Sequence, residues 1–200
     1  MALARELLRT VRTTNSRLLR TDMAVAGTLG VVGDVVCQLG IERADAQETD
    51  VRRVAANCVF NTVYCGGFLH FVFRFYPPIV CALGRRLTPL GDTLRRQVAT
   101  PGKFPHVLGC ALVDNAHLGL IYTPAFFLTV GPLQGHSLQS SAANLQAEWW
   151  NTYAGCCGFW LPFMCVSFAF ISPARRVQAM NAANLVWCSI IDFIAHRRLH

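Results

Sequence analysis

WWNTYAGCCGFWLPFMCVSFAFI, residues 149–171, is the stretch of this chain that decides its fold. It holds no charged residue and exceeds the ~20 residues that a helix needs to cross the ~30 Å hydrocarbon core of a bilayer. Pro162 stands near its middle, with Gly158 one turn earlier, which predicts a helix kink and a backbone carbonyl left without its usual donor. We therefore interpret residues 149–171 as a kinked membrane-spanning helix.

Three more apolar stretches are long enough to span a membrane, and each carries a single charged residue. They are residues 23–41 with Asp34, residues 54–82 with Arg74 and residues 106–133 with Asp114. A fifth stretch, residues 177–195, is more polar and predicts an interfacial or partly buried helix. The prolines at 77–78 and 132 stand near span edges and predict helix ends. The fold class predicted is all-α: an integral membrane bundle of four transmembrane helices.

Composition supports the membrane interpretation. Of the 200 residues, 53% are hydrophobic and only 14% are charged, and the mean hydropathy is +0.36. An ordinary soluble domain carries about a quarter charged residues, so this chain has too few to cover a soluble globule. The net charge of +7 is almost all arginine, placed in blocks between the apolar stretches. Such blocks suit membrane flanks, so we expect the lipid bilayer as partner and no nucleic acid.

The first 22 residues form a separate segment ahead of a single membrane domain, residues 23–200. Residues 1–20 contain five arginines and one acid, and their leucines and arginines fall on opposite sides of a helix. A basic amphipathic N-terminal helix of this kind is typical of mitochondrial presequences. A helix lying on a membrane surface before the first span has the same pattern.

The charges of the connecting segments alternate in sign along the chain. Residues 1–22 sum to +3, residues 42–53 to −1, residues 84–104 to +4 and residues 132–148 to −1, and Arg175 and Arg176 add +2. By the positive-inside bias, the three basic segments lie on one side of the membrane. This alternation agrees with four crossings.

Polar residues recur at helical spacing inside three of the spans. The candidate intramembrane or pore-lining residues are Gly30, Asp34 and Gln38, then His70 and Arg74, then Asp114, Asn115 and His117. An ionisable group in a membrane needs a partner, water or a function. One interpretation is neutralisation, with Arg74 paired to Asp34 or Asp114. The others are a narrow aqueous path or a surface that binds another membrane protein.

Motifs for catalysis and metal binding are missing from the sequence. No nucleophile elbow, glycine-rich phosphate loop or His-Glu-x-x-His is found. The nine cysteines are odd in number and include no Cys-x-x-Cys pair, so they predict buried apolar side chains. We expect no enzyme activity, no metal and no cofactor.

The polar positions resemble a known pattern, that of the Mpv17 / PMP22 family of small organelle membrane proteins (PMP, peroxisomal membrane protein). The resemblance covers residues 18–195. Gly33, Asp34 and Gln38 fit the family's Gly-Asp-x-x-x-Gln, and Gly66 and His70 fit part of its Gly-Pro-x-x-His. The C-terminal signature is represented by Pro162, Pro173, Arg176, Asn181 and Trp187, whereas Cys165 and Phe168 replace its Gln and Asn.

The resemblance implies a four-span protein of the mitochondrial inner membrane or, alternatively, the peroxisomal membrane. The arginine-rich N-terminus favours mitochondria. The family is regarded as small-solute channels, so the first hypothesis is a weakly selective channel for small solutes or ions, able to assemble as a homo-oligomer. The alternative is a non-conducting membrane scaffold or assembly partner.

Overall fold

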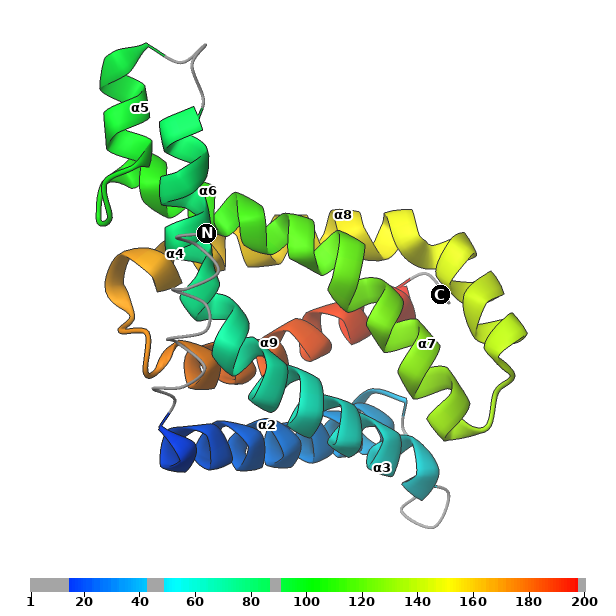
Figure 1. Ribbon diagram of the computed structural model, residues 1–200. Helices are drawn as coiled ribbons and strands as arrows, with labels where there is room; N and C mark the ends of the chain where they lie inside the picture. Colours follow the sequence, from blue (N-terminus) through cyan, green and yellow to red (C-terminus); the bar gives the residue numbers. More distant parts are fainter. Residues whose placement is uncertain (1–14, 43–48, 87–90, 198–200) are drawn as a thin grey trace. The chain divides into compact units, whose positions relative to one another are not determined.

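The computed structural model describes residues 15–42, 49–86 and 91–197, with side chains as far as Trp187 except that of Ile41. Every regular element in these ranges is a helix (Figure 1). Four helices are long and apolar enough to cross a membrane: Ser16–Gly40, Val51–Arg86, Phe104–Gln134 and Leu138–Phe170. The predicted fold class, a helical membrane protein with four spans, is therefore confirmed.

Three of the four spans change between α-helical and π-helical winding along their length, and η marks the π-helical stretches. The elements in chain order are α2 (Ser16–Val36), η1 (Cys37–Ile41), α3 (Val51–Phe60), η2 (Asn61–Phe68), α4 (Leu69–Arg86), α5 (Asp92–Val98), α6 (Phe104–His117), η3 (Leu118–Tyr122), α7 (Thr123–Gln134), α8 (Leu138–Phe170) and α9 (Arg176–Arg197). Stretches of π-helix are frequent at functional sites.

Several helix boundaries differ from the sequence-based expectation. Helix α2 already begins at Ser16, so it runs through the predicted boundary at residues 22–23. Most of the predicted N-terminal helix, residues 1–14, lies outside the described residues. The prolines at 77–78 and 132 lie inside α4 and α7, so the prediction that they end helices is wrong. Neighbouring groups in a membrane bundle satisfy the carbonyls that such prolines free.

Local sequence explains where three of the helices begin or end. The Asp50 side chain accepts a hydrogen bond from the Arg53 backbone N–H and caps the start of α3. Ser137 Oγ does the same for the Ser140 N–H at the start of α8. After α7 the chain turns at Gly135, whose φ of +99° favours glycine.

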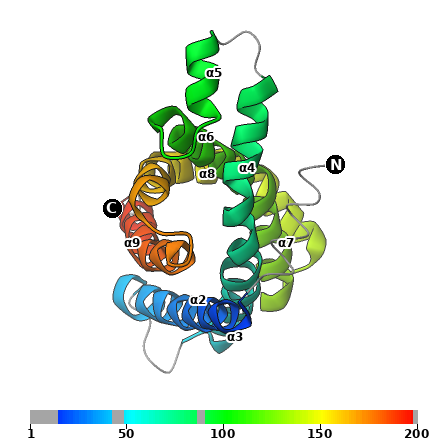
Figure 2. The ribbon, with the colours of Figure 1, turned by 60° about the vertical axis from the view of Figure 1, so that its left-hand side comes forward.

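The chain divides into two compact units, each built from separate parts of the sequence. Unit 2 consists of Ser16–His70, Phe126–Asn144 and Val177–His200. Within it, α2 runs alongside α3 and η2, as Figures 1 and 2 both show. The start of α9 is buried in the same unit, with Val177 and Asn181 hardly exposed. The C-terminal helix is thus partly buried, as predicted.

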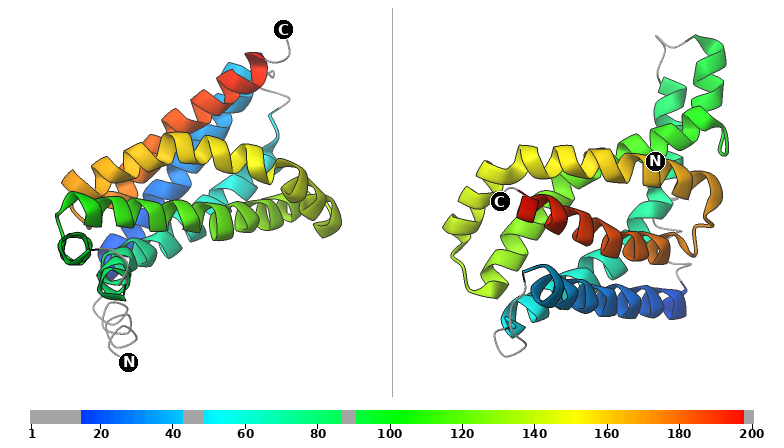
Figure 3. Two further views of the ribbon diagram at one scale, coloured as in Figure 1. Left: turned by 90° about the horizontal axis from the view of Figure 1, so that it is seen from above. Right: turned by 180° about the vertical axis from the view of Figure 1, so that it is seen from behind.

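Unit 1 consists of Met1–Asn15, Phe71–Ala125 and Leu145–Arg176. The end of α4 meets the end of α5 closely, because a Cβ atom on Gly84 would lie 2.9 Å from Val98 Cγ1. The span that contains α6 runs beside α8 (Figure 3), where Trp149 Nε1 donates to the Gly119 carbonyl at 2.9 Å. Buried Cys110, Trp160 and Met164 belong to the core of this unit.

Candidate functional site

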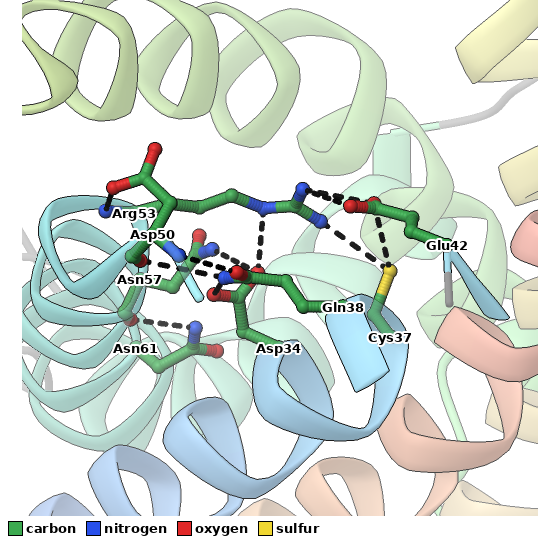
Figure 4. Close-up of polar contacts among 8 residues, drawn as sticks. All are labelled: Asp34, Cys37, Gln38, Glu42, Asp50, Arg53, Asn57 and Asn61. Carbon is green, nitrogen blue, oxygen red and sulfur yellow. Dashed lines mark hydrogen bonds and ion pairs between the residues drawn. The ribbon is translucent and has the colours of Figure 1, made fainter. Parts of the chain in front are cut away.

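The polar side chains at the end of the first span form one hydrogen-bonded cluster in unit 2, which we call the Asp34 cluster. Figure 4 shows its members, which come from α2, η1, α3, η2 and the segment between the spans: Asp34, Cys37, Gln38, Glu42, Asp50, Arg53, Asn57 and Asn61. Asp34 is buried, and its Oδ1 accepts from Arg53 Nε at 2.8 Å and from Asn57 Nδ2 at 3.0 Å. Its carboxylate is therefore both ion-paired and hydrogen-bonded.

Arg53 and Gln38 tie the ends of the two spans together. The Arg53 guanidinium also donates to both Glu42 carboxylate oxygens, at 2.8 and 3.0 Å. Gln38 Nε2 donates to Asp34 Oδ2 at 2.9 Å, and Gln38 Oε1 accepts from the Asp50 N–H at 2.7 Å. Both contacts between Arg53 and Glu42 come from the same nitrogen, Nη1, and charge-assisted hydrogen bonds of this kind are stronger than neutral ones. The Asp34 cluster therefore links η1 to the start of α3 by hydrogen bonds.

Arg74 does not play the role that the sequence predicted for it. Asp34 takes Arg53 as its ion-pair partner, and Asp114 interacts with the Tyr76 side chain. Within the described part of unit 1, half-buried Arg74 forms no ion pair. The expected pairing of Arg74 with Asp114 is thus wrong within the described part of unit 1, and Asp34 pairs with Arg53. The physical reason is that α3 begins at Val51, before the predicted second span, so Arg53 is a helix residue whose side chain reaches Asp34.

A second buried pair joins Asp22, near the start of α2, to His70, near the start of α4. His70 Nδ1 lies 2.7 Å from Asp22 Oδ2, and both side chains are almost completely buried. Gln178 Nε2 of α9 donates to Asp22 Oδ1 at 3.3 Å. Asp22 therefore holds two helices of this unit at once. His70, a predicted site residue, is part of this pair.

The polar stripe of α2 is a helix-packing surface in unit 2. A Cβ atom on Gly30 would lie 2.8 Å from Asn61 Nδ2, and one on Gly66 would lie 2.7 Å from the Asp22 carbonyl oxygen. Small residues at such contacts allow helix backbones to approach closely. Gly30, Asp34 and Gln38 thus face α3, η2 and the segment before α3, all parts of their own unit.

The polar residues of α6 have a different environment in unit 1, and we call Asp114, Asn115 and His117 the Asp114 group. All three side chains are buried. Asp114 interacts with Tyr76, whose ring centroid is 6.2 Å from that of His117. Asn115 Nδ2 donates to the Ala111 carbonyl, whereas Asn115 Oδ1 has no partner among the described protein atoms. Among the described residues Asp114 forms no ion pair.

The proline of the fourth span is accommodated inside α8. The helix continues past Pro162 to Phe170, and a Cβ atom on Gly158 would meet nothing within 4 Å. Proline has no N–H, so the Gly158 carbonyl lacks its usual donor one turn later. The kink predicted at Gly158 and Pro162 remains a prediction.

Sequence reasoning missed Asp22 and Arg53. Asp22 lies eight residues before Gly30, two steps of the i, i+4 spacing of Gly30, Asp34 and Gln38, so extending this stripe by two turns through Ala26 would have found it. Arg53 gave no such signal, because it lies in a run of charges that resembles an exposed connector. The interaction across α2 and α3 depends on tertiary packing that no local pattern encodes.

The fold and the buried ionisable groups define a helical integral membrane protein. A sequence model of the Mpv17 / PMP22 family matches residues 131–191, which include the whole predicted C-terminal signature from Pro162 to Trp187. The chain is 25% identical to human "Mitochondrial inner membrane protein Mpv17", over 89% of this chain and 90% of the relative. The predicted resemblance to the Mpv17 / PMP22 family is therefore confirmed.

Other relatives agree with this relationship. "Protein SYM1" of Kluyveromyces lactis is 21% identical over 86% of this chain and 80% of its own length. "PXMP2/4 family protein 4" of Dictyostelium discoideum is 25% identical over 84% of this chain and 80% of its own length. No solved structure matches the chain. The name of the human relative agrees with the predicted location, the mitochondrial inner membrane.

Proposed function

We propose that this protein provides a path for small solutes or ions across the mitochondrial inner membrane, and that the Asp114 group is part of its polar lining. The observation that carries the proposal is the contrast among the buried acids of the described spans. Asp34 is ion-paired with Arg53, and Asp22 is hydrogen-bonded to His70 and Gln178, whereas Asp114 forms no ion pair with a described residue.

The contrast matters because a carboxylate in a low-dielectric interior is costly unless a cation or water balances it. Asp34 meets this requirement through Arg53, and Asp22 is hydrogen-bonded within its own unit, so both acids support a structural role. The Asp114 side chain and the Asn115 Oδ1 atom are available to accept hydrogen bonds from water or from a permeating species. Ionisable residues left in this state within transmembrane helices mark solute and ion paths.

The distribution of these groups also supports the channel hypothesis over the scaffold hypothesis. The α2 stripe packs against helices of its own unit, so it does not offer its small residues to a partner helix. That reduces the support for a scaffold that binds through this stripe. Assembly into a homo-oligomer is part of the channel proposal, and light scattering of the purified protein in detergent measures it.

Single-channel recording in planar bilayers tests the proposal. The wild-type protein is expected to give discrete currents, and Asp114→Asn is expected to change their unit conductance or their cation-to-anion permeability ratio. Asp92→Asn is the matched control, since it makes the same charge change at an exposed connector residue of the same unit. It should leave both quantities unchanged.

Two results would count against this proposal. Silent bilayers containing folded wild-type protein would favour the scaffold. Currents that Asp114→Asn leaves unaltered would remove the Asp114 group from the path.

A further inference from the structure

Arg176 is a buried arginine in unit 1, at the point where the connector after α8 passes into α9. Its exposed fraction is only 4%, whereas the neighbouring Arg175 is exposed. Arginine is almost never fully buried unless it is paired. The role of Arg176 therefore depends on which groups pair with its guanidinium.

Only some of the hydrogen-bond donors of the Arg176 guanidinium have acceptors in the described part of the protein. Its Nη2 donates to the Ile171 carbonyl at 3.0 Å, and the guanidinium carbon lies 4.3 Å from the centre of the Phe168 ring. Its Nε has no hydrogen-bond acceptor among the described protein atoms. The ion pairs of the described residues all involve other cations, so no carboxylate balances this guanidinium.

The described residues recorded in contact with Arg176 or within its electrostatic range carry no carboxylate: Phe168, Ile171 and Cys110. Cys110 of α6 lies within electrostatic range of the guanidinium, and Cys110 Sγ is 3.6 Å from His106 Nε2. His106 Nδ1 donates to the Val98 carbonyl at 2.9 Å, which ties this region to the end of α5. Burial lowers the pKa of Arg176, because the charged form loses its hydration. A nearby anion would offset that loss.

The connecting segment on the same side of the predicted topology is also basic. The charges of residues 84–104 sum to +4. Their single acid is Asp92, whose Oδ1 lies 3.6 Å from Arg95 Nη2. Exposed Arg175 adds a further positive charge. A potential of this sign raises the local concentration of anions.

We propose that Arg176 anchors a binding site for a phosphate-type oxyanion, held by the guanidinium edge that carries Nε. Arginine is suited to this because its planar fork donates parallel hydrogen bonds to two oxygens of a phosphate. Stacking on Phe168 fixes the plane of the fork, and the Ile171 carbonyl occupies only one donor. Free phosphate compounds and phospholipid headgroups share this chemistry. The site does not depend on conduction by the Asp114 group.

Thermal unfolding of the full chain in maltoside detergent, which carries no phosphate, tests the site and separates the two sources of phosphate. One series titrates the detergent-solubilised protein with inorganic phosphate, with sodium chloride of equal ionic strength as reference. The other adds phosphatidylglycerol to the same micelles and compares it with an equal amount of diacylglycerol, which has no phosphate. A ligand that binds the folded state raises Tm with its concentration.

The variants are Arg176→Gln and its matched control Arg175→Gln, which removes the same charge from the exposed neighbour. The rise in Tm should be lost in Arg176→Gln and kept in Arg175→Gln. A response to inorganic phosphate identifies a free anion as the ligand, and a response to phosphatidylglycerol alone identifies a lipid headgroup. No rise with either, or a rise that Arg176→Gln retains, overturns the site.

A measurement on the wild-type chain keeps the inference testable if Arg176→Gln does not fold. The Arg176 Nε–H resonance is assigned in ¹⁵N spectra by its loss in Arg176→Lys. Phosphate or phosphatidylglycerol should shift it, because the proton gains an acceptor. An unchanged resonance at saturating concentrations of both would overturn the site.

Discussion

Replacing Gly66 by alanine tests the close packing of η2 on α2 in unit 2. A Cβ atom at this position would lie 2.7 Å from the Asp22 carbonyl oxygen and 2.9 Å from the Met23 backbone nitrogen. The Met23 Cα atom would lie closer still, and ordinary contact begins at 3.4 Å, so the two helices must separate by more than about 0.7 Å. Backbone atoms cannot rotate away as a flexible side chain does. The same shift would stretch the hydrogen bond between Asp22 and His70, which is 2.7 Å long.

Overpacking of this kind costs ~1–3 kcal/mol, and the better helix propensity of alanine offsets up to ~1 kcal/mol. We expect a net loss of about 1–2 kcal/mol, or a fall in Tm of about 2–8 °C for a chain of this size. Gly158→Ala is the matched control, because nothing lies within 4 Å of its Cβ position. It should raise Tm slightly. Near-ultraviolet circular dichroism in detergent measures both; equal shifts of one sign would refute the packing argument.

Two other predictions follow from the charged residues. Asp34→Ala should destabilise the protein by ~1–3 kcal/mol, since it removes the oxygen that accepts from both Arg53 Nε and Asn57 Nδ2, whereas Asp92→Ala should cost under ~1 kcal/mol; equal Tm values for the two variants would contradict this. Changing every arginine within residues 1–14 to glutamate should abolish mitochondrial import of a tagged chain, measured by fractionation, because import draws a positive helix inward. Unaltered mitochondrial location would show that targeting lies elsewhere.

The sequence was sufficient to predict the fold class, because four long apolar stretches leave few alternatives. It was less informative at helix ends. Pro77 and Pro132 carry the signal that ends helices in soluble proteins, yet α4 and α7 continue through them. The hydrocarbon core of a membrane holds no water that could hydrogen-bond the backbone groups exposed at a helix end. The helix therefore continues past proline.

The candidate site was predictable only where its residues repeat along one helix. The spacing of Asp34 and Gln38 placed them on one face, and both lie in the Asp34 cluster. Their partner Arg53 comes from another helix and was not predictable from local spacing. Arg176 was noticed only as a connector charge beside Arg175 and as part of a family signature, since an arginine after a span usually lies in water at the membrane surface.

Thiol labelling tests most directly whether water reaches the polar face of α6 and is excluded from that of α2. In a cysteine-depleted chain in proteoliposomes, Asn115→Cys should react with a membrane-impermeant thiol reagent, because thiols ionise and react only in contact with water. Ala26→Cys should stay protected, since Ala26 is buried on the α2 stripe with 1% exposure. Protection of both positions, or labelling of Ala26→Cys alone, would contradict a path lined by the Asp114 group.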